Sequence, residues 1–188
     1  MTLQITDVLI TYGAQGTVGG LMAVAMGREL GPILVGVVLA GRVGAAITAE
    51  IGTMKVTEQI DALRVMAVNP IGYLVVPRVV ACMIMVPILA FYGVVIGIAG
   101  GYFVATTIKG LAPATYLDSI QMFSTISDFT LGLIKSSVFG AVIALVGCYK
   151  GMHTKMGAEA GGFSTTSSVV TSIILVFELN YFLSTLLF

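Results

Sequence analysis

Apolar residues in this chain form long continuous runs that are separated by short polar segments. The runs cover about residues 17–48, 79–108, 129–149 and 165–187. As a helix, each run is long enough to cross the roughly 30 Å hydrocarbon core of a bilayer. Apolar and polar positions do not alternate within the runs, so they predict helices and not the strands of a membrane barrel. The pattern therefore predicts an all-α fold, a polytopic α-helical membrane protein with about four transmembrane helices.

Charged residues interrupt the first run, and each of the first two runs contains a proline. Arg28 and Glu29 lie inside the first run, which would be about 48 Å long as one straight helix. Because this length exceeds the hydrocarbon core, the first run is predicted to tilt or to kink, with Pro32 as the kink. Pro87 is predicted to bend the second run. The Asn-Pro dipeptide at 69–70 predicts a turn before that run.

The composition supports a membrane protein and excludes several other classes. The chain has 188 residues, of which 57% are hydrophobic and 10% charged, and its formal net charge is zero. This balance lacks the basic excess of a nucleic-acid-binding protein. The two cysteines, Cys82 and Cys148, lie in apolar segments and are interpreted as packing residues and not as a disulfide or a metal site. The sequence offers no nucleophile motif and no phosphate-binding loop, so we expect no enzyme.

One compact charged segment, AEIGTMKVTEQIDALRV at residues 49–65, stands between the first two runs. A helix over 54–67 would carry an apolar stripe made of Val56, Ile60, Leu63 and Ala67. Two opposite-charge pairs three residues apart support such a helix: Lys55 with Glu58, and Asp61 with Arg64. The segment is thus predicted to be a short amphipathic helix. It either lies among the lipid headgroups or docks onto a soluble partner.

The basic residues of the connecting segments predict the topology. Lysines and arginines concentrate in the segments 50–78 and 150–155, whereas the other side of the membrane has Lys109 and little else. Because basic residues accumulate on the cytoplasmic side, both segments are predicted to be cytoplasmic. Both ends of the chain are then expected on the opposite side.

The stretch RELGPILVGVVLAGRVGAAITAEIGTMKVTEQIDALRVMAVNPIGYLVVPR, at residues 28–78, resembles the MlaE (YrbE-type) permease family. The motif IKSSVFG at 134–140 and the segment STTSSVV at 164–170 are also similar to that family. The likeness covers essentially the whole chain, as one permease domain over 1–188. It implies the membrane subunit of an ABC transporter that moves phospholipids between membranes. It also implies a homodimer, a cytoplasmic ABC ATPase that binds the ATP, and an MCE-domain lipid-binding partner. The chain itself is expected to hold no cofactor.

The resemblance assigns two groups of site residues. Residues 50–66 match the coupling helix that contacts the ATPase, and the matching positions are Glu50, Gly52, Met54, Lys55, Glu58, Asp61 and Arg64. The lipid-binding cavity is expected to involve Gln4, Val8, Leu9, Tyr12, Arg28, Glu29 and Glu178. For Arg28 and Glu29, the alternative is a structural ion pair with neighbouring helices, or a helix end above the membrane. Glu178 is interpreted either as a satisfied buried carboxyl or as part of the cavity.

This sequence departs from the family pattern in three places. Family members usually begin with an interfacial helix and a further transmembrane helix, so this chain is N-terminally short; a misassigned start or a fragment is expected. The last helix of the family often carries an acid where Asn180 stands, and some members have a basic residue near 167–168. The second and third departures concern polar contacts to a lipid headgroup.

Two other functions fit the residues without the resemblance. The first is an ion-coupled secondary transporter or channel in which Glu29 or Glu178 binds the coupling ion. The second is a non-transporting membrane anchor that recruits a cytoplasmic protein through residues 50–66. A bacterial inner membrane and a chloroplast inner envelope both suit the family function.

Overall fold

The computed structural model describes residues 2–154 and 158–187, and these residues form helices joined by short connections, with no strand among them. The α-helices, in chain order, are α1 (Thr2–Thr11), α2 (Val18–Ala25), α3 (Gly31–Leu39), α4 (Ala45–Val56), α5 (Gln59–Val65), α6 (Val76–Phe103), α7 (Pro113–Phe123), α8 (Ile126–Met152) and α9 (Ala158–Leu187). Shorter helical turns adjoin them: η1 (Gln15–Thr17), η2 (Met26–Leu30), η3 (Ala40–Gly44), η4 (Ile71–Val75) and η5 (Val104–Ile108).

Four of these helical stretches, within the described residues, are long and apolar enough to cross a membrane. Their bounds are Gln15–Val56, Ile71–Ile108, Ile126–Met152 and Gly161–Leu187. The predicted all-α, multi-pass architecture is confirmed. All four spans are longer than the predicted apolar runs, because the helices continue into the flanking residues. The first span thus includes residues 50–56, which the resemblance assigns to the coupling helix.

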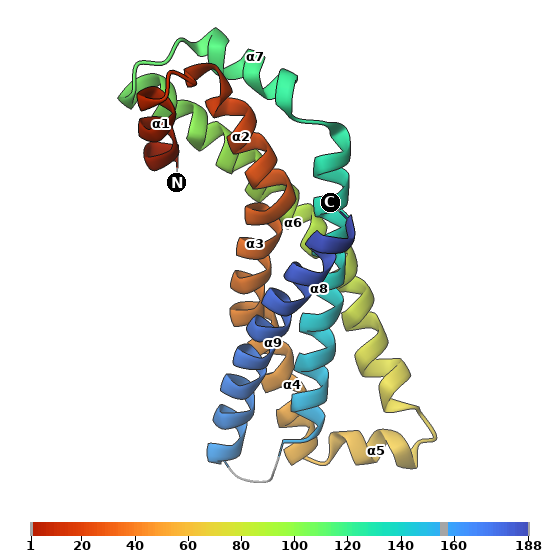
Figure 1. The fold of residues 1–188 in the computed structure, drawn as a ribbon. Coiled ribbons are helices and arrows are strands. Elements are labelled where there is room, and N and C mark those ends of the chain that lie inside the picture. Colours follow the sequence, from red (N-terminus) through yellow and green to blue (C-terminus); the bar gives the residue numbers. More distant parts are fainter. Residues whose placement is uncertain (1, 155–157, 188) are drawn as a thin grey trace.

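The chain arranges these spans as an elongated bundle (Figure 1). Helix α5, the last turn of α8 and the first turn of α9 lie at one end, whereas α1, α7 and the last turn of α9 lie toward the other. This arrangement agrees with the relative sides predicted from the basic residues. Lys155, one of those basic residues, lies outside the described part of the chain.

Helix α8 forms the centre of the bundle because its glycines allow very close approach of its neighbours. A Cβ atom added at Gly132 would lie 2.0 Å from the carbonyl oxygen of Gly27 in the first span. A Cβ at Gly140 would lie 2.5 Å from the carbonyl oxygen of Cys82 in α6. Small residues at such contacts let backbones pack tightly in lipid, where no hydrophobic force drives helices together.

The predicted single helix over 54–67 is wrong, because the chain turns sharply at Glu58. Glu58 adopts a left-handed backbone conformation (φ 60°), which ends α4 and starts α5. The turn lays α5 across the end of the bundle (Figure 1). Ile60, from the predicted apolar stripe, is thereby buried to 1% exposure and joins the core cluster. Burying a side chain of this size contributes about 2 kcal/mol, which favours the turn over a straight helix that projects into solvent.

Residues 113–123 form the helix α7, which lies outside the apolar runs and was not predicted from them. Gly110 has a positive φ of 67°, and Pro113 occupies the first turn of α7, where a proline is well tolerated. Helix α7 packs on α2, where a Cβ at Gly19 would lie 2.2 Å from the carbonyl oxygen of Tyr116. The outer ends of the first two spans are therefore tied to a helix that crosses over them (Figure 1).

Candidate functional site

A cluster of ionised side chains lies inside the membrane-spanning part of the bundle. The ammonium group of Lys135 is fully buried and donates to Glu29 Oε1 at 3.0 Å, to Ser184 Oγ at 2.7 Å and to the carbonyl oxygen of Arg28 at 3.3 Å. An ammonium carries three hydrogens, so these three acceptors match its donor capacity. This satisfies a charge that would otherwise be very costly to bury.

Glu29 receives further hydrogen bonds from the last helix. Asn180 Nδ2 donates to Glu29 Oε2 at 2.9 Å, and Ser184 Oγ lies 2.7 Å from Glu29 Oε1. Asn180 and Ser184 are one helical turn apart on α9, so they face the first span together. The predicted alternative of a structural ion pair for Glu29 is therefore present in the structure. It connects the first span, α8 and α9.

Arg28 points to a second carboxylate, that of Asp128. Its Nε and Nη2 atoms lie 2.8 and 2.6 Å from Asp128 Oδ1. Asp128 is nearly fully buried and also accepts from the backbone and the hydroxyl of Thr125, in a capping box that begins α8. The four charges of Arg28, Glu29, Asp128 and Lys135 sum to zero. We call these four residues, with Asn180 and Ser184, the intramembrane polar cluster.

The cluster is only partly shielded. The side chains of Arg28 and Glu29 are 39% and 36% exposed, whereas those of Asp128 and Lys135 are 3% and 0% exposed. Arg28 and Glu29 can therefore be reached by a polar group from outside the chain, and the buried partners hold them in place. Glu178 does not join the cluster; its side chain is exposed on α9.

The N-terminal residues from the predicted lipid cavity are at the outer end of the bundle. Gln4, Val8 and Leu9 line a shallow apolar groove on α1 of about 240 Å³, together with Ile5. Tyr12 is 81% exposed beyond the end of α1. The structure thus brings three of these four residues together, in a groove separate from the intramembrane polar cluster.

A second apolar groove lies between α6 and α7. It has a volume of about 400 Å³. Its lining residues are Val95, Ile98, Ala99, Tyr102, Tyr116, Leu117 and Ile120. The outer half of the bundle therefore offers apolar grooves as well as ionised groups.

The predicted coupling residues lie at the opposite end of the bundle, on α4 and α5. Lys55 Nζ donates to Asp61 Oδ2 at 3.0 Å, and Arg64 Nη1 donates to Asp61 Oδ1 at 2.9 Å. The Asp61–Arg64 pair is confirmed, but Lys55 pairs with Asp61 and not with Glu58, because the turn at Glu58 carries that carboxylate away. The hydrogen bond from Lys55 lowers the pKa of Asp61 below its ordinary value.

The other predicted coupling residues join α4 to its neighbours. Glu50 Oε1 lies 2.8 Å from Arg78 Nη2, which ties α4 to α6. Gly52 is buried next to Thr154 at the end of α8, and Met54 packs against the core cluster. These three residues therefore hold α4 in the bundle. They do not lie on the outward side of α5.

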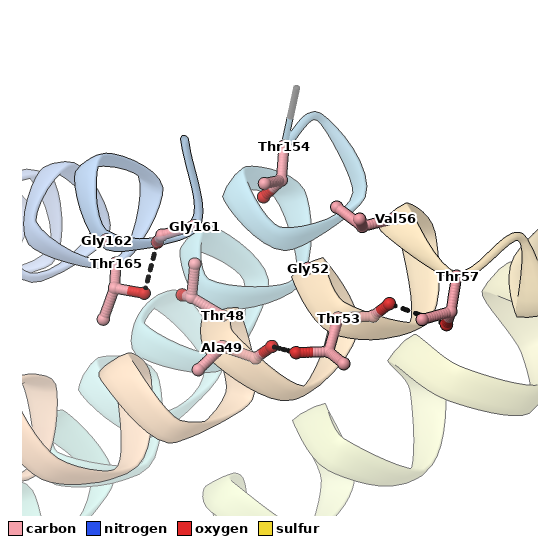
Figure 2. Close-up of a pocket in the computed structure, with 10 residues that line it drawn as sticks. All are labelled: Thr48, Ala49, Gly52, Thr53, Val56, Thr57, Thr154, Gly161, Gly162 and Thr165. Atoms are coloured by element: carbon pink, nitrogen blue, oxygen red, sulfur yellow. Dashed lines mark hydrogen bonds between the residues drawn. The ribbon is translucent and has the colours of Figure 1, made fainter. Parts of the chain in front are cut away.

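A pocket of about 520 Å³ lies beside α4 at this end (Figure 2). It is lined by Thr48, Ala49, Gly52, Thr53, Val56, Thr57, Thr154, Gly161, Gly162 and Thr165. The hydroxyls of Thr53, Thr57 and Thr165 donate to carbonyl oxygens four residues earlier in the chain. Because these hydroxyls are hydrogen-bonded to the backbone, the threonines contribute few free hydrogen-bond donors to the pocket.

Sequence reasoning missed Asp128, Lys135, Asn180 and Ser184 as members of the intramembrane polar cluster. Lys135 carried a usable signal, because a cation inside an apolar run requires a nearby anion or several acceptors. Its partner could not be read from the spacing, since Glu29 lies 106 positions away.

The described residues contain no group of three or more side chains suited to hold a metal ion.

The chain is similar to known proteins over nearly its whole length. The family described as permease MlaE matches residues 1–186. A probable ABC transporter permease protein of Synechocystis is 48% identical over 187 residues, covering 100% of this chain and 71% of that protein. A probable ABC transporter permease protein of Rickettsia typhi is 44% identical over 177 residues, covering 94% of this chain and 68% of that protein.

A third relative comes from Pyropia yezoensis. The probable ABC transporter permease protein of Pyropia yezoensis is 40% identical over 187 residues, covering 100% of this chain and 71% of that protein. The family matches residues 1–186, and the three relatives are 40–48% identical to this chain. A membrane permease also agrees with the bundle of four apolar spans. The chain belongs to the MlaE permease family of ABC transporters.

Proposed function

We propose that this chain is the permease subunit of an ABC transporter that moves phospholipids between membranes. A phospholipid is an amphiphile, so it needs both polar and apolar surfaces. The single observation that supports this substrate is that polar and apolar surfaces occur together in the outer half of the bundle. There the partly exposed Arg28 and Glu29 accompany the apolar grooves on α1 and between α6 and α7.

The proposed energy source is a cytoplasmic ABC ATPase that binds α5. Helix α5 buries Ile60 against the bundle, while Val65 and Met66 remain 88% and 64% exposed. Exposed apolar residues beside ionised groups such as Arg64 are typical of a surface that binds another protein. Because Ile60 and the Glu50–Arg78 pair connect this end to α4 and α6, a movement of α5 can reach both spans.

The remaining partners belong to the same proposal. A homodimer of this chain with two ATPase subunits and an MCE-domain protein would form the complete transporter. We place it in a bacterial inner membrane or a chloroplast inner envelope. Nothing in this assignment requires a cofactor in the chain itself, since the ATPase would bind ATP.

The experiment that tests the function is purification of the chain from native membranes, followed by reconstitution. We expect mass spectrometry to find an ABC ATPase, an MCE-domain protein and phospholipid, and we expect ATP to drive movement of labelled phospholipid between vesicles. Transport that follows an ion gradient without ATP would favour the secondary transporter instead. An ATPase that is recovered without bound lipid and without ATP-driven lipid transfer would favour the membrane anchor.

Val65→Asp is expected to reduce the amount of copurified ATPase at least tenfold. The change introduces a charge at an exposed apolar position of the proposed contact, and truncating or charging one central contact costs about 2 kcal/mol or more. Quantitative mass spectrometry of the purified complex measures the effect. The matched control is Met122→Asp on α7, at the other end of the bundle, which is 80% exposed. Equal ATPase recovery from both variants would contradict binding through α5.

A further inference from the structure

Pro32 in the first span and Pro87 in the interior of α6 lie within the membrane-spanning helices, whereas Pro77 stands in the first turn of α6. A proline has no N–H, so the carbonyl four residues earlier loses its usual donor. The two carbonyls affected are those of Arg28 and Met83. In lipid, such a carbonyl is costly unless a neighbouring side chain satisfies it.

Both carbonyls receive a donor from the same short segment of α8. Lys135 Nζ donates to the carbonyl oxygen of Arg28 at 3.3 Å, and Ser137 Oγ donates to the carbonyl oxygen of Met83 at 2.9 Å. Residues two apart on a helix point in different directions. Lys135 and Ser137 can therefore reach two different neighbours, the first span and α6, from almost the same level of α8.

The close glycine contacts bring α8 near both spans beside these two bonds. Gly132 approaches the carbonyl oxygen of Gly27, and Gly140 approaches the carbonyl oxygen of Cys82. The intervening Ser136 behaves differently, because its hydroxyl donates within α8 to the carbonyl oxygen of Gly132 at 2.8 Å. Within this segment, the donors to the carbonyls that the two prolines release are thus Lys135 and Ser137.

We infer that Lys135 and Ser137 are positioning residues that fix the proline-containing parts of the first span and of α6 to α8, so that the outer parts of both spans move as one unit. We call this pair of hydrogen bonds the α8 clamp. Helix α7, packed on the outer end of the first span, would follow the same movement. The use of the clamp in lipid transport rests on the proposed function, but the clamp itself does not.

A double-mutant cycle between Ser137 and Pro87 tests the clamp. Ser137→Ala leaves the Met83 carbonyl without a donor, whereas Pro87→Ala supplies a backbone N–H for the same carbonyl. With Pro87 present, we expect Ser137→Ala to lower the thermal unfolding midpoint in detergent by about 2–4 °C, the shift expected for a loss of about 1 kcal/mol. In the Pro87→Ala background, Ser137→Ala should cause no shift.

Two matched variants control for the loss of a hydroxyl as such. Ser136→Ala removes a neighbouring hydroxyl that does not contact the released carbonyls, so the midpoint should stay within about 1 °C of the wild-type value. Ser137→Thr keeps the hydroxyl and should preserve most of the wild-type midpoint.

Distances between spin labels report the positioning role directly. In a background with Cys82 and Cys148 replaced by alanine, one label would replace Ile96 on the outer part of α6 and another Leu145 on α8. Both positions are exposed. We expect Ser137→Ala to broaden this distance distribution by electron spin resonance with Pro87 present, and to leave it unchanged in the Pro87→Ala background.

Each possible outcome is decisive. If Ser137→Ala has the same effect in both backgrounds, or none with Pro87 present, the clamp is refuted. Neither readout depends on lipid transport. Failure of the wild-type complex to move phospholipid would therefore refute the proposed function and leave the clamp standing.

Discussion

Glu29→Gln should destabilise the bundle by about 2–3 kcal/mol, because it removes the carboxylate that pairs with the fully buried ammonium of Lys135. Breaking a buried ion pair by removing one partner typically costs about 3–5 kcal/mol. The side chain of Glu29 is 36% exposed, so solvent reduces the effect to the lower part of this range or below it. Equilibrium unfolding of the purified chain in mixed micelles measures the loss.

Glu178→Gln is the matched control, since it makes the same chemical change on an exposed side chain. We expect a change within about 0.5 kcal/mol there. A second variant, Glu29→Gln with Lys135→Met, removes both charges and should recover part of the lost stability, although the Arg28 carbonyl then loses its donor from α8. Equal losses from Glu29→Gln and Glu178→Gln would show that the ion pair contributes nothing.

Gly132→Ala should destabilise the bundle by about 1–3 kcal/mol, the usual cost of adding a methyl group where there is no space. The new Cβ would lie 2.0 Å from the carbonyl oxygen of Gly27, and a backbone atom cannot give way as a flexible side chain can. The first span and α8 must then separate. The same unfolding measurement applies, and transport by the reconstituted complex should fall with it.

Gly41→Ala provides the contrast for this contact. Gly41 is also in the first span, but a Cβ there would meet nothing within 4 Å. Alanine has the better helix propensity, so this variant should be neutral or stabilising by up to about 1 kcal/mol. If both glycine variants lose the same stability, close packing of α8 is not the cause.

The sequence predicted the helical spans well because a membrane permits very few kinds of backbone structure. Continuous apolar runs of this length have few alternatives in lipid, where every backbone group must be satisfied within the structure. The resemblance between residues 28 and 78 likewise identified the family, which the match over residues 1–186 confirms. Helix α7 was missed because Gly110 and Pro113 mark a break in the preceding helix but do not indicate that a new helix begins there.

The polar contacts inside the bundle could not be predicted in the same way. The sequence indicates that Arg28, Glu29 and Lys135 need partners, but the partners are on other helices and depend on how those helices rotate. The turn at Glu58 was invisible for a related reason. Glutamate seldom adopts a left-handed conformation, and the burial of Ile60 against the bundle favours it here. Propensity alone therefore predicted a straight helix.

The four spans differ in length. At 1.5 Å per residue, the helical stretches Gln15–Val56 and Ile71–Ile108 are about 63 and 57 Å long, whereas the other two are about 40 Å. A helix much longer than the roughly 30 Å hydrocarbon core must tilt, kink or project beyond it. Residues 50–56 end the first of these stretches, so they form a rigid extension of a membrane-spanning helix. A force applied to this extension from outside the bilayer would act directly on the helix within it.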